Sequence, residues 1–387
     1  MKRSTDRILT THVGSLPRPH ALLDTMRARY NHEAYDEAAW QAQVKQTVAD
    51  VVKKQAENGI DVVDDGEMGK VGFFNYVRER LTGFEPGEPD PDPYAGRGRE
   101  LRAFPEYYAR YLGRRTGPRI SSSNPVKCTG PVTYVGHEAL QTDIANLKAA
   151  MQGVNVVEAF MPAIAPRGVG RNFYYKTEEE YVEAVANAMH EEYQAIVDAG
   201  IVLQVDDAWL TSLYGADESI DLQVRRREAE KYVEILNHSL RGIDPANVRF
   251  HTCYGINEGP RVYDVPFEDF IDIMLKVNAG AYSFEAANPR HYHEWHLWER
   301  FKLPEGKSLI PGVITHASNV VEHPEFIADL ICNYASLVGR ESVIAGADCG
   351  FSSNASYDTD VEDRVVWAKF ASMAEGAALA TKRLWGK

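Results

Sequence analysis

The sequence predicts one α/β domain, a (β/α)8 or TIM barrel with loop insertions. Short β-branched runs alternate with amphipathic helical stretches about eight times along the 387 residues, which is the unit count of such a barrel. A doubly wound open sheet is the rival fold, but the glycine-rich fingerprint of its dinucleotide-binding form is missing. Polar residues follow the ends of the strand-like runs, where barrels build their sites.

The predicted strands are short and apolar, and most end in an acid, a histidine or a cysteine. In chain order they cover residues 7–13, 60–64, 125–131 and 201–207, followed by runs that end at Cys253, Glu285, His316 and Cys349. Val156-Val157 is a candidate ninth strand. The nearby Pro162, Pro166, Gly168 and Gly170 favour a loop insertion instead.

Helical stretches separate these strands. Residues 37–55 carry Ala, Val and Trp at helical spacing and stop at Asn58-Gly59. Thr177-Glu178-Glu179-Glu180 has the form of a capping box and begins a helix that runs to residue 199. Further helices are predicted at residues 224–240, 267–279 and 324–338.

Composition and charge limit the classes of protein to consider. The net charge of -14 argues against a nucleic-acid partner or an anionic membrane surface. The sequence shows no secretory leader and no apolar run long enough to span a bilayer. Four cysteines are too few for a disulfide-stapled scaffold, so we expect a cytoplasmic protein. The oligomeric state stays open, a homo-oligomer included.

His251 and Cys253 are the first candidate metal ligands. They lie two residues apart at the end of a predicted strand, so their side chains share a face. An imidazole beside a thiolate suits zinc, although this pair alone is weak evidence because buried cysteines are common. Glu285 and Cys349 follow two other strands. If all four meet at the mouth of a barrel, they are enough for a tetrahedral Zn²⁺ site.

Such a ligand set points to sulfur chemistry. Two thiolates, a carboxylate and an imidazole around a divalent cation carry a net charge of about -1, which makes a poor Lewis acid for activating water. The same centre can capture a substrate thiol as a nucleophilic thiolate. We therefore predict a zinc enzyme that transfers an alkyl group from a small-molecule donor to a thiol. Glu285 is the ligand that we expect the thiol to displace.

These motifs resemble the catalytic half of cobalamin-independent methionine synthase over nearly the whole chain. They appear in the family's order: residues 10–17, Asp65-Gly66-Glu67, Gln204-Val205-Asp206, His251-Thr252-Cys253-Tyr254, Phe284-Glu285, residues 316–320 and Asp348-Cys349-Gly350. The resemblance implies that residues 1–387 form a single catalytic barrel. It also implies zinc held by His251, Cys253, Glu285 and Cys349, and methyl transfer to homocysteine giving methionine.

The resemblance implies further roles for residues at the strand ends. Val13, Gly14, Ser15, Glu67 and Asp206 are expected to hold the amino-acid end of homocysteine, and His316 is expected to be the proton donor. Independently of the family, two buried acids suit an ammonium group, and a histidine suits proton transfer near neutral pH.

Two alternatives stay open. The segment 207–210 does not continue the family's usual Asp-Glu-Pro-Ala pattern, which leaves the methyl donor unassigned. The superfamily also includes epoxyalkane:coenzyme M transferase, which opens an epoxide with a zinc-bound thiolate. Arg290 is the candidate ligand for a sulfonate in that case, whereas Glu67 and Asp206 favour an amino-thiol acceptor. The second alternative is a barrel that binds zinc or thiols without catalysis.

Overall fold

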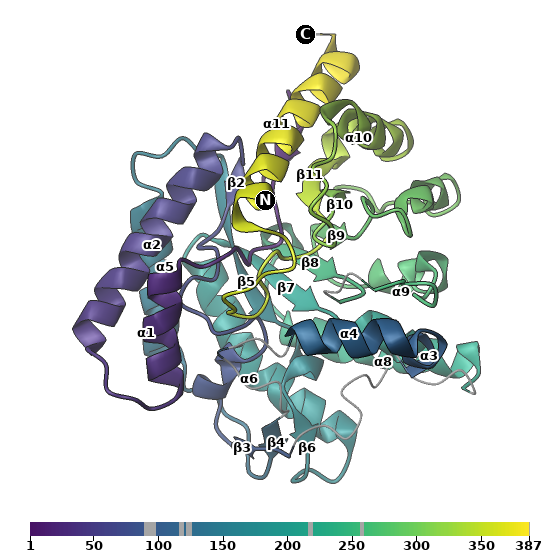
Figure 1. The fold of residues 1–387 in the computed structure, drawn as a ribbon. Helices are drawn as coiled ribbons and strands as arrows, with labels where there is room; N and C mark the ends of the chain where they lie inside the picture. The colour runs from purple at the N-terminus through teal and green to yellow at the C-terminus, as the bar shows by residue number, and fades with distance from the viewer. Residues whose placement is uncertain (89–97, 116–119, 121–125, 216–219, 256–258, 387) are drawn as a thin grey trace.

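The chain folds as a TIM barrel in the computed structural model, which describes residues 1–88, 98–115, 120, 126–215, 220–255 and 259–386. Within these residues eight strands, all parallel, form one sheet (Figure 1). A bridge between Thr11 and Val62 joins the first strand to the second and closes the barrel. Around the barrel the strands are β1 (Leu9–Thr10), β2 (Val62–Val63), β5 (Glu158–Ile164), β7 (Val202–Asp207), β8 (Val248–Thr252), β9 (Ala281–Phe284), β10 (Ser308–Ile314) and β11 (Ile344–Ala347).

The third barrel strand is β5, and the prediction of a loop insertion there was wrong. Pro162 lies inside β5, opposite Gln204 of β7. Proline is tolerated in a strand that lacks a neighbour on one side. β2 pairs with β5 only at Glu158 and Ala159, so at Pro162 the strand has a paired neighbour only in β7.

The segment predicted as the third strand lies outside the barrel. β4 (Val126–Cys128) forms a separate three-stranded sheet with β3 (Phe84–Pro86) and β6 (Arg171–Asn172). In Figure 1 this small sheet lies below the barrel, near the lower end of the α6 helix. The prediction of a barrel strand at residues 125–131 was therefore wrong, because this segment pairs with β3 and β6 in an insertion outside the barrel.

Helices surround the barrel as predicted (Figure 1). Thr177 caps α6 by accepting a hydrogen bond from the Glu180 main-chain N–H at 3.1 Å, which confirms the capping prediction. The long helices are α1 (His20–Tyr30), α2 (Glu37–Glu57), α5 (His137–Ala150), α6 (Glu178–Asp198), α8 (Leu222–Ser239), α10 (Pro324–Val338) and α11 (Asp363–Trp385). The predicted helix at 267–279 is only a 3-10 turn, Phe267–Asp269, followed by α9 (Ile271–Met274).

The shorter helices occupy the loops. They are α3 (Gly98–Ala103), α4 (Pro105–Arg115), α7 (Trp209–Gly215) and a 3-10 segment at Tyr292–Glu299. None of the helices in the described part of the chain combines the length and the apolar character needed to cross a bilayer.

One face of β8 leads from the barrel interior to its mouth. Arg249, His251 and Cys253 alternate along the chain and so share this face. Arg249 is buried, stacks on the ring of Phe160 at 4.0 Å and donates to the main-chain oxygen of His12 at 2.6 Å. The guanidinium fills the barrel interior, and the next two side chains on that face reach the mouth.

Gly312 of β10 makes room for the end of β11. A Cβ at this position would lie 2.7 Å from the main-chain N and Cα of Asp348. We expect Gly312→Ala to lower the free energy of unfolding by about 1–3 kcal/mol, because the strands must move apart. Denaturant unfolding measures this. Gly130→Ala is the control, since its Cβ would meet nothing closer than 3.6 Å, and equal stability of the two variants would contradict the packing argument.

Candidate metal centre

Two strand ends bring three of the predicted metal ligands together. His251 and Cys253 come from β8, and Cys349 follows β11. One nitrogen and two sulfur atoms from these side chains all lie within 4.8 Å of one another, and all three residues are buried. Ligands of one tetrahedral zinc lie about 3.3–3.8 Å apart, given bond lengths of about 2.0–2.3 Å. A small inward movement would therefore complete a common coordination sphere.

The imidazole of His251 is oriented as a metal ligand. Its Nδ1 lies 3.1 Å from the hydroxyl of Ser283 on the neighbouring strand β9. Its Nε2 is buried and has no hydrogen-bond partner among the described residues. A histidine ligand commonly uses one ring nitrogen for a metal and the other for such a supporting hydrogen bond. The orphaned Nε2 and the two adjacent sulfurs therefore fit a zinc ion.

A hydrogen bond links the two thiols and changes the pKa of each. The Cys349 thiol donates to Cys253, and this hydrogen bond lowers the pKa of Cys253 well below its usual value while raising that of Cys349. Burial lowers the pKa of His251, but its interaction with the nearby Cys253 thiolate outweighs burial and raises it. The protein thus favours a thiolate at Cys253, which is the form that binds metal.

Glu285, the fourth predicted ligand, is not gathered with the other three. Its carboxylate accepts from the main-chain N–H of Tyr254 at 2.8 Å and from the amide of Asn288 at 3.0 Å. It also lies 2.7 Å from the guanidinium of Arg261. Glu285 is close enough for its charge to raise the pKa of Cys349. The partners of its carboxylate are therefore Tyr254, Asn288 and Arg261, not the three residues of the His251 group.

Asp348 anchors the loop that carries Glu285. Its carboxylate accepts from the main-chain N–H groups of Ala286, Ala287 and Asn288 at 2.7–3.0 Å. This links the end of β11 to the loop after β9, so the positions of Glu285 and Cys349 depend on each other.

His316, the predicted proton donor, lies beside this anchor. One of its ring nitrogens is within 4.8 Å of ligand atoms of Glu285 and Asp348. Both ring nitrogens are buried without a hydrogen-bond partner among the described residues. Burial lowers the pKa of His316 to about 4, partly opposed by the charge of Asp348, so the ring is neutral near pH 7.

A small cavity opens between the thiols and a pair of acids. Its volume is about 40 Å³, room for only a few water molecules at roughly 10–15 Å³ each. The lining is contributed mainly by the carboxyl ends of barrel strands: Val13, Ser15, Glu67, Phe73, Asp206, Asp207, Ala208, His251, Cys253, Gly255, Cys349, Gly350 and Ser353. The structure thus brings Val13, Ser15, Glu67 and Asp206 to the same cavity as three of the predicted metal ligands.

Two of the three acids that line the cavity, Glu67 and Asp206, are held at an energetic cost. Burial raises the pKa of Glu67 to about 7, although the ammonium of Lys70 lowers it. Burial also raises the pKa of Asp206 to about 6, against the charge of His251 and a hydrogen bond from Gln204. Glu67 has a φ of 57°, which is unfavourable for a residue with a Cβ, and its Oε2 is buried without a hydrogen-bond partner among the described residues. A cation that binds between these two acids would reduce the repulsion between their negative charges.

The remaining predicted residues lie elsewhere. Gly14 does not line the cavity, although Val13 and Ser15 on either side of it do; its φ is 130° and there is no room for a Cβ, which would meet Pro162 at 2.6 Å. Arg290 is exposed and donates to the main-chain oxygen of Val262 at 2.6 Å, away from the cavity. Ser353 is a lining residue that the sequence did not predict, because no strand or motif identifies its loop.

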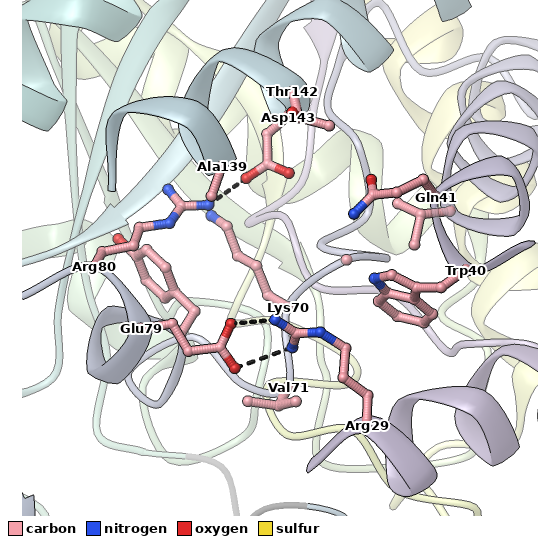
Figure 2. A pocket seen from close by; sticks show the side chains of 13 residues that line it. Arg29, Trp40, Gln41, Lys70, Val71, Glu79, Arg80, Ala139, Thr142 and Asp143 are labelled. Atoms are coloured by element: carbon pink, nitrogen blue, oxygen red, sulfur yellow. Dashed lines mark hydrogen bonds and ion pairs between the residues drawn. The ribbon is translucent and has the colours of Figure 1, made fainter. Parts of the chain in front are cut away.

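A larger pocket lies on the helical side of the protein, among α1, α2, α5 and the loop after β2 (Figure 2). Its volume is about 110 Å³, and none of the predicted site residues lines it. The cationic side chains that line it already have partners. Arg29 pairs with Glu79 at 2.6 Å, and Arg80 pairs with Asp143. Lys70 donates to a main-chain oxygen of β5 at 2.7 Å. Size alone therefore does not identify the functional cavity, and the chemistry favours the smaller one.

The fold and the site together define a class: a TIM barrel with a buried histidine–dithiol centre at the carboxyl ends of its strands. The family model described as cobalamin-independent synthase, catalytic domain, matches residues 8–91 and 168–365. The chain belongs to this family. The matched ranges contain all four predicted ligands and all three acids that line the cavity.

Individual relatives extend the likeness over nearly the full chain. A methionine synthase of Sulfolobus acidocaldarius is 23% identical over 382 residues, which cover 97% of this chain and 93% of that protein. One from Saccharolobus islandicus is 24% identical over 376 residues, covering 97% and 95%.

Two solved structures share the fold. The B12-independent methionine synthase from Shewanella sp. W3-18-1, in complex with selenomethionine, has a TM-score of 0.73 and 18% identity. A putative B12-independent methionine synthase from Listeria monocytogenes has a TM-score of 0.65 and 20% identity. Each likeness covers 98% of this chain and 100% of the other.

The metal assignment predicts different behaviour for two buried cysteines. We expect Cys349→Ser to lose most bound zinc, because a neutral hydroxyl replaces a thiolate ligand. Cys128→Ser should keep about one zinc per chain, since Cys128 belongs to the small sheet and its thiol contacts the main-chain oxygen of Gly130 at 3.3 Å. Elemental analysis and chelator competition measure both. Equal zinc content in the two variants would rule out Cys349 as a ligand.

Proposed function

We propose that this protein is a zinc-dependent methyltransferase that acts on the thiol of homocysteine and forms methionine, with residues 1–387 as one catalytic barrel. The observation that carries the proposal is the composition of the cavity. His251, Cys253 and Cys349 line it together with the acids Glu67 and Asp206. A substrate with a thiol and an ammonium group matches both sets of residues. The names of the relatives and the family support the same reaction.

The acids are proposed to hold the ammonium group of homocysteine. The Oε2 of Glu67 is buried and accepts no hydrogen bond within the described residues, with Arg18 3.9 Å away, and its neighbour Asp206 adds a second negative charge. In a buried cavity these charges attract a cation more strongly than in water. Val13 and Ser15 form the adjacent wall, which leaves the substrate thiol directed toward the cysteines.

Zinc held by His251, Cys253 and Cys349, with Glu285 as the fourth ligand, would supply the lowered thiol pKa that makes the sulfur nucleophilic at neutral pH. The substrate sulfur then attacks the methyl carbon, and the bond from that carbon to the donor breaks. The donor atom gains the electron pair and needs a proton. His316, which is neutral near pH 7, is proposed to accept the proton that the substrate thiol loses and to pass it to the donor atom, because no hydrogen bond within the described residues engages either of its ring nitrogens.

The described cavity lining favours an amino-thiol over coenzyme M as acceptor. It includes three acids with raised pKa values, Glu67, Asp206 and Asp207, and neither Arg nor Lys. A sulfonate in this position would face repulsion and would lack a guanidinium or ammonium partner. Arg290 donates to Val262 at the surface instead.

The reaction is tested by product analysis with the zinc-loaded protein. We expect homocysteine to be converted to methionine with at least one methyl donor when methylfolates and methylcorrinoids are compared. Coenzyme M with an epoxide is the control pair, and a hydroxyalkyl thioether as the main product would instead support the alternative transferase. Bound zinc and bound thiol without product from any donor would support a binding protein.

Binding of methionine should depend on pH through Glu67. The acid must be ionised to hold the ammonium group, so its pKa of about 7 makes binding weaken as pH falls. We expect affinity to drop about twentyfold from pH 8 to pH 6, a factor of about ten from protonation of Glu67 and about two from Asp206, whose pKa is about 6. Methionine carries no ionisable thiol, which isolates the effect of the acids.

Glu67→Gln should weaken methionine binding at pH 8 and leave a dependence of only about twofold between pH 8 and pH 6, from Asp206 with its pKa of about 6. Glu79→Gln is the control, because this half-exposed carboxylate pairs with Arg29 in the larger pocket. Calorimetric titration measures all three proteins. A flat pH profile in the unmodified protein would exclude Glu67 from ammonium binding.

A further inference from the structure

Arg261 lies beside the candidate metal centre and binds the predicted ligand that is separated from the other three. Its Nη1 is 2.7 Å from the Oε2 of Glu285, and its Nε donates to Asp264 at 2.7 Å. The Arg261 side chain is only 5% exposed, and that of Glu285 is fully buried. Ion pairs in such surroundings are costly to break, because one charge is then left uncompensated.

The backbone at Arg261 is also unusual. Its φ of 57° lies in the left-handed region, which residues with a Cβ avoid. Conformations of this kind persist where surrounding contacts enforce them, and they cluster at functional sites. Here Asp264 and Glu285 engage the guanidinium on two sides. The strained conformation directs this side chain to the carboxylate of Glu285.

The place that Glu285 occupies is a complete binding position for a carboxylate. Besides Arg261, the Tyr254 main-chain N–H and the Asn288 amide donate to its two oxygens. Glu285 does not line the cavity that contains His251, Cys253 and Cys349. The side chain therefore has a stable position outside the group of metal ligands.

We propose, on the basis of the function proposed above, that Arg261 receives the carboxylate of Glu285 when the substrate thiolate takes its place as the fourth zinc ligand. Exchange of a carboxylate for a thiolate leaves the charge of the centre unchanged, but it sets free one buried negative charge beside that centre. The guanidinium neutralises this charge at a site already formed. Arg261 is thus a positioning residue that acts through Glu285 and favours thiol entry.

This role predicts that the two substitutions of Arg261 weaken thiol binding to different extents. In Arg261→Gln the displaced carboxylate loses its cationic partner, so homocysteine should bind the zinc protein about ten- to a hundredfold more weakly, given the strength of hydrogen bonds to charged groups. Arg261→Lys keeps the charge but offers a single ammonium in place of a fork that engages two carboxylates. It should fall between Arg261→Gln and the unmodified protein. It also keeps the test possible if the glutamine variant does not fold.

The experiment uses zinc-loaded protein with and without homocysteine. Zinc X-ray absorption counts the sulfur and the nitrogen or oxygen ligands, and titration of the spectral change gives the thiol affinity. Arg300→Gln is the control, because it removes an exposed arginine from a pair with Glu268 of the same length, 2.7 Å. In the unmodified protein, homocysteine should replace one oxygen ligand with one sulfur.

Affinities in the order unmodified protein, lysine variant, glutamine variant, with the control unchanged, support the proposal. Equal thiol affinity in all four proteins overturns it, even if the Arg261 variants unfold more easily, because a purely structural role alters stability and not ligand exchange. Absence of zinc, or no added sulfur in the unmodified protein, would contradict the proposed function itself. Normal ligand exchange in both Arg261 variants would contradict only the role of Arg261.

Discussion

The carboxylate of Asp348 is the interaction on which the geometry of the centre depends. It follows β11 directly and accepts hydrogen bonds from three consecutive main-chain N–H groups in the loop after β9. The two strands are not neighbours, since β10 lies between them. Gly312 of β10 leaves the space for this connection. Without it, the barrel would still place Cys349 at its mouth, but the loop with Glu285 would have no fixed position relative to that thiol.

The two ends of the small cavity differ in chemistry. At one end, His251 and the two thiols form a nitrogen–sulfur set that suits a cation. At the other end, burial leaves Glu67 and Asp206 with raised pKa values. Both ends are destabilised when empty, because buried charges and unpaired polar atoms cost free energy. The rest of the barrel offsets this cost, so binding of a metal and an ammonium group can recover it.

The ligands on regular strands could be predicted from the sequence, and residues on irregular segments could not. His251 and Cys253 alternate at the end of an apolar run, and that pattern alone places them on one face. β5 was missed because Pro162 argues against a strand, and only the early end of β2 makes a proline acceptable there. The role of Arg261 could not be predicted from the sequence, because its loop has no periodic pattern. Its approach to Glu285 depends on how two loops fold together.

The separation of Glu285 from the other ligands follows from the elements that carry them. His251 lies within β8, and the short thiol side chains come just after β8 and β11, so the barrel backbone restricts where these atoms can lie. Glu285 lies in a loop and has a longer side chain with more rotatable bonds. Asp348 restrains the main chain of that loop, while the carboxylate can still turn between partners without disturbing the strands. A carboxylate is also a harder and less tightly held zinc ligand than a thiolate. The fold therefore combines three positioned candidate ligands, an imidazole and two thiols, with one adaptable carboxylate, an arrangement that in the proposed function would allow a substrate sulfur to enter without opening the barrel.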